Sequence, residues 1–326
     1  MLDQEYLVFG CGQFNRSNES STSLLTLAAI NKEMPKEHLP IYQIQDFQAH
    51  VQKEHYFYLS SFAAHLQEHL FIREPHKHNF YIIFFITQGT GSHTIDFKTY
   101  AVKPSLVFFM MPGQVHSWEL SDDTDGFVIF FTPEFYLKEF PHRKLSEFPF
   151  FNALLHKPIL SISPEEQAAL LPIFQALQRE HLNHWAILRQ EMLSCYLDIL
   201  LIYLTRIYRT QETELTVPGG EFSLLQNLEA LIERHYKEHV PVTYYAGKLN
   251  VTAKHLKEVC KSSLGKTTTE LIQERLILEA QRLLVHSELT SSQIAAELGY
   301  FDNTYFFRFF KKRTGCTPEQ FRSLNK

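Results

Sequence analysis

The chain has 326 residues, 44% of them hydrophobic, which is enough to bury two separate cores. Its four cysteines have no paired spacing, so we expect reduced thiols rather than disulfides or a cysteine-ligated zinc site. The first residues lack a basic segment followed by an apolar run, and the longest apolar stretch, around residues 193–204, is too short to cross a bilayer. We therefore expect a cytoplasmic protein with no secretory signal and no membrane segment.

The formal charge of the chain is −5, and it is unevenly distributed. From residue 221 onward there are 15 lysine and arginine residues against 12 acidic ones, a difference of +3, so the preceding part carries −8. A basic C-terminal part on an acidic body suits a protein that binds DNA through one end.

Residues 1–40 are mixed and polar, and we treat them as an N-terminal extension to which the sequence assigns no role. From about residue 56 the pattern is typical of short strands separated by turns. Short strands at close spacing predict an antiparallel β-barrel of the jelly-roll type over residues 41–150. The predicted strands are 80–88, 92–97, 106–111, 116–120 and 127–131.

Histidines lie beside two of these strands: His76 and His78 precede the first, and His116 follows a turn before another. This part resembles a cupin-type sensor domain. Metal-binding cupins combine a His-x-His pair with an acidic ligand a few residues later and a further histidine, because several ligands must converge on one ion. Ile82 and Ile83 stand where that carboxylate would fall. We therefore expect no metal and no other cofactor, with a three-histidine site as the alternative.

The aromatic strands also suggest a place for a ligand. Alternation sends every second side chain inward, so an open barrel would hold a ring of aromatic side chains around a pocket. We expect this pocket to receive a small-molecule effector, with four residues at its mouth: His76, His78, His116 and Trp118. The alternative for each of the four is an ordinary position in the core.

Two helices are predicted after the barrel, in a connector over residues 151–210. Ser163 begins the first, with Pro164 at its first position and two glutamates in its first turn, and it runs to about residue 181. The second covers about 184–209 and has two apolar faces. One face is a seam at 4-3-4-3 spacing, which predicts a homodimer contact, with burial of both faces inside one subunit as the alternative. The seam consists of Leu188, Met192, Cys195, Ile199 and Ile202.

A polar linker over residues 211–221 is predicted to lead into a second, all-helical domain over residues 222–326. In this domain one pattern occurs twice: a short helix, a turn, and a second helix that begins at a capping residue and ends at a glycine. Each copy predicts a helix-turn-helix. The matching pairs, all at one offset, are Ala246/Ala296, Thr252/Asp302, Leu256/Phe306, Val259/Phe309, Cys260/Phe310, Lys261/Lys311, Gly265/Gly315 and Thr267/Thr317.

The second helix of each copy has an apolar face for the core and an opposite face that should be exposed. In the second copy Phe306, Phe309 and Phe310 form the apolar face. The opposite faces mix amides, hydroxyls, a ring and cations, which suits contact with base edges and phosphates. The predicted DNA contacts are Lys254, Lys257, Glu258 and Lys261 in the first copy and Asn303, Thr304, Phe307, Arg308, Lys311 and Lys312 in the second, with Lys312 at a phosphate.

An amphipathic helix over residues 268–286 connects the two copies. At 1.5 Å per residue it is roughly 30 Å long, close to the ~34 Å repeat of DNA. One rod of this length can hold two reading helices in successive major grooves.

One set of residues in the second domain follows a known pattern: Leu276, Ala280, Leu283, Leu284, Ile294, Ala295, Leu298, Gly299, Tyr300, Asp302, Tyr305, Phe306, Arg308, Phe310, Lys311, Gly315, Thr317, Pro318, Phe321 and Arg322. Through them residues 222–321 resemble the DNA-binding domain of the AraC/XylS family of bacterial transcription regulators, and cupin-type sensor domains occur in many of that family. The resemblance implies that the last reading helix and the exposed face of the first contact DNA. Two departures are visible: Phe307 stands where the family often has a small polar residue, and Gly247 lies within a helix, where glycine costs about 1 kcal/mol.

Together these features predict an α+β protein with an antiparallel, cupin-like jelly-roll barrel, a helical connector and an all-α double helix-turn-helix domain. We expect a sequence-specific transcription regulator with no catalytic residues. Its expected partners are double-stranded promoter DNA, a small-molecule effector, a second copy of the chain and, if it is an activator, RNA polymerase. One alternative is a cupin enzyme with an accessory DNA-binding tail, which the missing carboxylate disfavours. Another is a regulator whose barrel binds no ligand.

Overall fold

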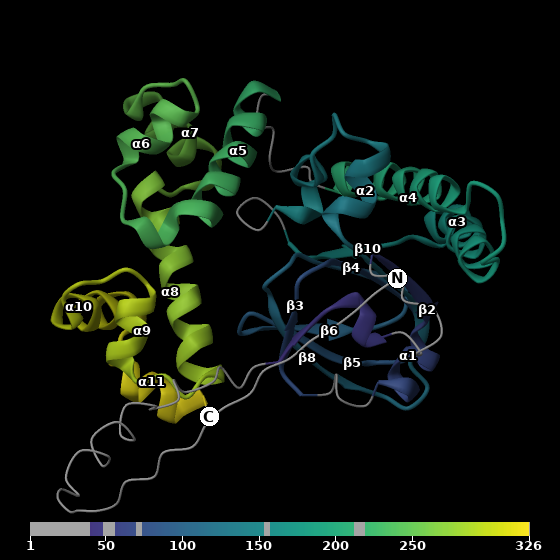
Figure 1. The fold of residues 1–326 in the computed structure, drawn as a ribbon, viewed down its shortest axis with the longest axis horizontal. Coiled ribbons are helices and arrows are strands. Elements are labelled where there is room, and N and C mark those ends of the chain that lie inside the picture. Colours follow the sequence, from purple (N-terminus) through teal and green to yellow (C-terminus); the bar gives the residue numbers. More distant parts are fainter. Residues whose placement is uncertain (1–39, 48–55, 70–73, 153–156, 212–218, 326) are drawn as a thin grey trace, which may run out of the picture. The chain divides into compact units, whose positions relative to one another are not determined.

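The computed structural model describes residues 40–47, 56–69, 74–152, 157–211 and 219–325. The predicted N-terminal extension lies almost entirely outside these residues, and so does most of the predicted linker. The described chain is an α+β protein, with strands in its N-terminal half and helices alone in its C-terminal half (Figure 1).

The N-terminal half contains two five-stranded sheets. Apolar side chains from both sheets, including Phe84, Phe108 and Trp118, form one core between them. The sheets are not joined to each other among the described strands, so the predicted barrel is an open jelly roll. One sheet has the order β1 (Ile41–Tyr42), β3 (His76–His78), β8 (Val115–Leu120), β5 (Gly91–Ile95) and β6 (Lys98–Val102); the other has β10 (Ile159–Ser161), β7 (Leu106–Met110), β4 (Tyr81–Gln88), β9 (Asp125–Phe131) and β2 (Phe57–Ser61).

The second sheet is buried on both faces, which explains why its strands are apolar without interruption. Along β4 the side chain of Phe84 enters the core between the sheets, whereas Phe85 packs outward, with its ring 5.2 Å from that of Phe174. Phe174 belongs to α3 (Pro164–Leu182), which lies with α4 (Arg189–Gln211) in the same outer core. The helices therefore cover the sheet face that points away from the other sheet. Short helices α1 (Phe62–Glu68) and α2 (Pro133–Glu139) complete this half.

The helix boundaries follow from local chemistry. The predicted start of α3 is confirmed, because Ser163 and Glu166 form a reciprocal capping box. The second helix begins at Arg189, later than predicted, because Leu188 has φ of 59° and cannot join a right-handed helix. Asp198 in the apolar part of α4 is buried, but it accepts a hydrogen bond from the Tyr136 hydroxyl at 2.6 Å and pairs with Arg143 at 3.1 Å.

The C-terminal half confirms the fifty-residue repeat. The helices α7 (Ala253–Leu264) and α10 (Asn303–Thr314) occupy equivalent positions, and each ends at a glycine in the left-handed conformation, Gly265 or Gly315. A single core joins both copies. The helix α8 (Thr268–His286) lies between the two copies in Figure 1. The remaining helices are α5 (Gly219–His235), α6 (Val242–Lys248), α9 (Ser291–Glu297) and α11 (Pro318–Asn325).

Two glycines in equivalent helix-turn-helix units should respond in opposite ways to alanine. Gly299 has φ of 80°, and a Cβ there would lie 2.2 Å from the carbonyl oxygen of Lys237. Gly299→Ala should therefore lower the free energy of unfolding by about 1 to 3 kcal/mol from backbone strain alone. Gly247 lies within α6 with open space around its Cα, so Gly247→Ala should raise the free energy of unfolding by about 1 kcal/mol. Urea unfolding of the two variants checks both signs, and equal effects would contradict this assignment.

Candidate DNA-binding surface and sensor site

The α7 helix presents a row of charged side chains to solvent. Its first turn is capped by Thr252, whose hydroxyl accepts from the backbone N–H of His255 at 3.1 Å. Lys254 and Glu258 form an ion pair at 3.9 Å, and because such surface pairs contribute little stability, both groups remain available to a partner. The exposure predicted for this face is confirmed for Lys254, Lys257, Glu258 and Lys261.

The α10 helix has the same organisation. Asp302 caps it by accepting from the backbone N–H of Thr304 at 2.8 Å. Phe306 and Phe310 are fully buried, and the half-buried Phe309 packs on the same core. Of the predicted contacts, Thr304, Arg308, Lys311 and Lys312 are exposed, and Asn303 is half-buried. Their contact with DNA stays a prediction.

Phe307 lies only partly on the exposed face on which the sequence analysis placed it. Its side chain is half-buried and packs against the core of the helical domain, with its ring 5.9 Å from that of Phe306. A helix turns by about 100° per residue, so Phe307 lies at the border between the two faces. The large ring at this border position packs toward the apolar side of the helix. Less of the ring is therefore available for contact with a base.

Two aromatic residues near the start of α10 were not predicted as functional. Phe301 is fully exposed, and Tyr305 is 62% exposed. Sequence reasoning missed them because large apolar residues are assigned to the core by default. The available signal was helical spacing, since Tyr305 precedes Arg308 by three residues and therefore shares its face. Rings beside an exposed cationic face can contact thymine methyl groups.

In the sensor domain, three histidines meet between the sheets. His76 and His78 are two residues apart on β3, so their side chains point to the same side of the sheet. His116 on β8 is the cross-strand partner of His76. The ring centroids of these three are 4.3 to 4.8 Å apart. One ring nitrogen from each lies within 4.8 Å of the other two.

Hydrogen bonds fix the orientation of these rings. The Nδ1 of His76 lies 2.7 Å from the backbone oxygen of Glu74. Because a carbonyl oxygen can only accept, this Nδ1 carries the proton, and in the neutral ring Nε2 is then the free lone pair. The Nδ1 of His116 lies 3.0 Å from Nε2 of His93 on β5, and its Nε2 lies 2.6 Å from Nε2 of His78.

The sequence analysis predicts these histidines at the open mouth of a pocket, but the structure places them inside the protein. His76, His78 and His116 are at most 3% exposed. Tyr42 and Phe47, from the segment before β2, lie against the rings of His76 and His78 respectively. Burial lowers the pKa of His76 to about 4. Burial and the other histidines lower the pKa values of His78 and His116 well below the usual range, so these rings are neutral near pH 7.

Trp118 is also buried, at 6% exposure, and its ring stacks on that of His93 with centroids 3.4 Å apart. It belongs to the core between the sheets. Trp118 therefore lies beside the histidine cluster and not at the mouth of a pocket, where the sequence analysis predicts it.

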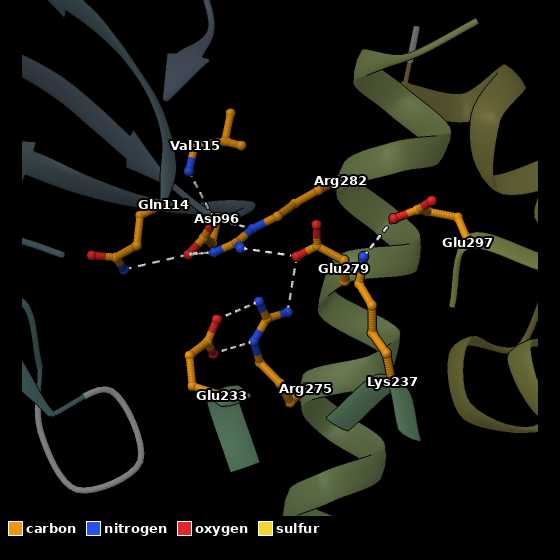
Figure 2. A network of polar contacts seen from close by, with 9 residues as sticks. All are labelled: Asp96, Gln114, Val115, Glu233, Lys237, Arg275, Glu279, Arg282 and Glu297. Carbon is orange, nitrogen blue, oxygen red and sulfur yellow. Dashed lines mark hydrogen bonds and ion pairs between the residues drawn. The ribbon is translucent and has the colours of Figure 1, made fainter. Parts of the chain in front are cut away.

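A polar network connects the sensor domain to α8. Asp96, in the turn between β5 and β6, accepts two hydrogen bonds from Arg282 of α8, at 2.9 Å and 2.7 Å. The same carboxylate accepts from the backbone N–H of Val115, one residue before His116 (Figure 2). A bidentate arginine–carboxylate pair of this kind is among the stronger polar contacts in proteins.

The network continues along α8 through a second carboxylate. Glu279 accepts from Arg282 at 3.2 Å and from Arg275 at 2.9 Å, and Arg275 also pairs with Glu233 of α5 (Figure 2). Burial opposes ionisation of Glu279, but the two arginines outweigh it and lower the pKa of this carboxyl. A pocket of ≈ 490 Å³ lies beside these residues, with Arg275 and Arg282 in its lining.

Among the described residues, no helix combines the length and hydrophobicity needed to span a membrane. The HTH-type transcriptional activator RhaR of Escherichia coli (strain K12) is 24% identical over 255 residues, which cover 77% of this chain and 87% of that protein. The unsaturated fatty acid-bound structure of ToxT from Vibrio cholerae is 15% identical, covers 84% of this chain and 98% of its own, and has a TM-score of 0.39. The C-terminal domain of AraT, a response regulator from Geobacillus stearothermophilus, is 27% identical over 34% of this chain and 88% of its own, with a TM-score of 0.31.

Two family models match the two halves of the chain. The model of the AraC-like ligand binding domain matches residues 56–191, which contain all strands of the jelly roll except β1, together with its covering helix α3. The model of the helix-turn-helix domain matches residues 245–323, which contain both reading helices and α8. The chain therefore belongs to the AraC family, as a helix-turn-helix transcription regulator with an N-terminal ligand-binding domain.

Proposed function

We propose that this regulator binds promoter DNA through the exposed faces of α7 and α10. The observation that carries the proposal is the repeated pattern of a buried apolar face and an exposed polar and cationic face, with one copy before α8 and the other after it (Figure 1). Phosphate contacts from lysines such as Lys312 would position the helices, and Asn303, Arg308 and Lys257 would read base edges. We add Phe301 and Tyr305 to the proposed contact surface.

We infer that the sensor domain regulates and does not catalyse. The named relatives of the chain are transcription regulators. The histidine cluster is buried beneath Tyr42 and Phe47, which suits a ligand that is held rather than a substrate that is turned over. Because its partner is promoter DNA, we expect the protein to act in the cytoplasm, and an activator of this kind would also contact RNA polymerase.

The Asp96–Arg282 pair offers a physical link between ligand and DNA. Asp96 holds the backbone of Val115, whose neighbour His116 belongs to the histidine cluster, and it holds α8, which carries both reading helices. A ligand that shifts His116 would therefore change the position of Asp96 relative to Arg282. Coupling of this type needs only a difference in ligand affinity between two arrangements of the link.

The exposed face of α4 supports a homodimer. Its seam residues Met192 and Ile199 are 40% and 48% exposed, whereas the opposite face, including Leu197 and Leu201, is fully buried in its own subunit. Trp185 and Ile187, just before α4, are almost entirely exposed. Several exposed apolar side chains next to a regular seam favour contact with a second copy of the chain. The alternative of both faces buried within one subunit does not hold for the described chain.

Selection of genomic DNA fragments by the full-length protein tests the proposed function. We expect the bound fragments to share a motif with two conserved parts about one DNA turn apart, because α8 separates the reading helices by a similar length. The control is the double variant Lys257→Ala/Asn303→Ala, which should enrich no motif. Equal enrichment by both proteins, or no motif with the wild type, would contradict the proposal. Ligand screening of the sensor domain then separates a ligand-dependent regulator from one whose jelly roll serves assembly alone.

A further inference from the structure

We propose that the sensor domain binds one divalent transition-metal ion of the zinc class through His76, His78 and His116. The proposal deepens the sensor part of the proposed function and rests on it only for the regulatory use of the ion. Three imidazoles from two neighbouring strands already converge, with one nitrogen of each within 4.8 Å of the others. Three histidines are a sufficient protein ligand set for zinc when a water, hydroxide or other ligand takes the fourth position.

Two of the three histidines have a polar partner for the ring nitrogen that would point away from a metal ion. Metal-bound histidines almost always donate the N–H of their other ring nitrogen to a fixed acceptor. His76 donates its Nδ1–H to the backbone oxygen of Glu74 at 2.7 Å, and the Nδ1 of His116 lies 3.0 Å from Nε2 of His93. This leaves the Nε2 lone pair of His76 available to an ion, and it leaves that of His116 available in the tautomer in which Nδ1 donates to His93.

The cluster is incomplete as a set of hydrogen bonds alone. Two imidazole nitrogens, Nε2 of His78 and Nε2 of His116, lie 2.6 Å apart, which is tolerable without an ion only if a proton lies between them. Zinc–nitrogen bonds of about 2.0 to 2.1 Å place two ligand nitrogens about 3.3 Å apart, so a small separation of the rings admits the ion. Nδ1 of His78 and Nδ1 of His93 are buried and have no hydrogen-bond partner in the described part of the chain.

The donor set and its surroundings select the class of ion. All three ligands are imidazoles, which suit Zn²⁺, Cu²⁺, Ni²⁺ and Fe²⁺, whereas Mg²⁺ and Ca²⁺ need oxygen ligands. Ile82 and Ile83 supply no carboxylate, so the ion would keep its charge unless an anion or hydroxide takes the fourth position. A pocket of ≈ 150 Å³ has His116, Pro75 and Ser117 in its lining.

Metal titration of the full-length protein, stripped with chelator and dialysed, tests the site. We expect one Zn²⁺ per chain by competition with a chromogenic chelator and by elemental analysis, with a rise in the unfolding temperature that Mg²⁺ does not produce. His76→Gln and His116→Gln should abolish this stoichiometric binding. His142→Ala, which removes an exposed histidine outside the cluster, should leave it unchanged.

His93 is a positioning residue, and two variants separate its role from packing. His93→Phe keeps a ring beside Trp118 but removes the acceptor for His116, so zinc affinity should fall by about 10- to 100-fold. His93→Gln retains an acceptor and should recover most of that loss. Equal affinity in His93→Phe and the wild type would remove His93 from the site.

The outcomes distinguish this proposal from the proposed function. Circular dichroism of the metal-free variants must match the wild type; if His116→Gln does not fold, His76→Gln carries the test. Failure of the wild type to bind Zn²⁺, or equal stoichiometry in the wild type and His76→Gln, overturns the metal site. DNA binding is measured on the same samples, so a protein that selects a DNA motif without binding zinc refutes this inference and leaves the proposed function intact.

Discussion

Ile199→Glu is expected to convert the protein from a dimer to a monomer and to lower its avidity for paired operators by about 10²- to 10⁴-fold. Ile199 lies near the middle of the seam on α4 and is 48% exposed in the single chain. A carboxylate placed there stays hydrated in the monomer but would lose its water at an apolar contact between subunits. The variant should therefore disfavour association without disturbing the fold of the subunit.

Dimerisation is expected to raise the avidity for paired half-sites, and it is not needed for one subunit to reach two successive grooves. One subunit carries both α7 and α10, so it can occupy two successive grooves without a partner. A second subunit adds a second pair of reading helices, and linkage makes the second binding event intramolecular. Affinity for a single half-site should consequently be unchanged by Ile199→Glu.

Sedimentation of Ile199→Glu and the wild type gives their oligomeric states, and titration with DNA that carries one or two half-sites gives their affinity and avidity. Thr210→Glu is a matched control, because it adds the same charge at an exposed position at the end of α4, outside the seam. It should remain dimeric. If Ile199→Glu is folded and still dimeric, the seam is not the subunit contact and the dimer must use another surface.

Lys257→Ala and Asn303→Ala are each expected to weaken specific DNA binding by about 1 to 3 kcal/mol per lost base contact. Lys257 lies on the exposed face of α7, and Asn303 lies at the start of α10. Neither side chain belongs to the core, so removing it should leave stability nearly unchanged. The loss should be largest for the preferred sequence and small for unrelated DNA.

Lys312→Ala should behave differently from these two variants. Its side chain is exposed in the last turn of α10, where it is expected to contact phosphate. Its removal should weaken binding to all sequences alike and lower the slope of log K against log salt by about 1. Titrations at several salt concentrations give both quantities. Lys138→Ala, which removes an exposed lysine from the sensor half, should change neither.

Unchanged affinity in both Lys257→Ala and Asn303→Ala would refute the assignment of these faces to DNA. Loss of binding to every sequence in Asn303→Ala would instead place that residue at the backbone. The two helices can also be separated, because each variant should relax the preference at its own part of the motif while leaving the other part unchanged.

The sequence by itself determined the features that depend on near neighbours. The capping boxes of α3, α8 and α9, the glycines that end α7 and α10, and the fifty-residue repeat all rest on hydrogen bonds or conformations within a few residues. The apolar runs of the sensor domain also identified five of its ten described strands, β4, β5, β7, β8 and β9, because their length and flanking turns are local properties. These signals were sufficient to predict both halves of the fold.

The tertiary structure decided the features that depend on contacts between distant segments. The exposure of Phe307 depends on the core that it borders. The outward side of β4 is covered by α3 and α4, which follow it in the chain by some eighty to a hundred residues. The convergence of His76, His78 and His116 depends on the pairing of β3 with β8. Spacing in the sequence could show that a carboxylate ligand was missing, but only strand pairing could bring three imidazoles to one point, because a ligand set is a property of distances in space.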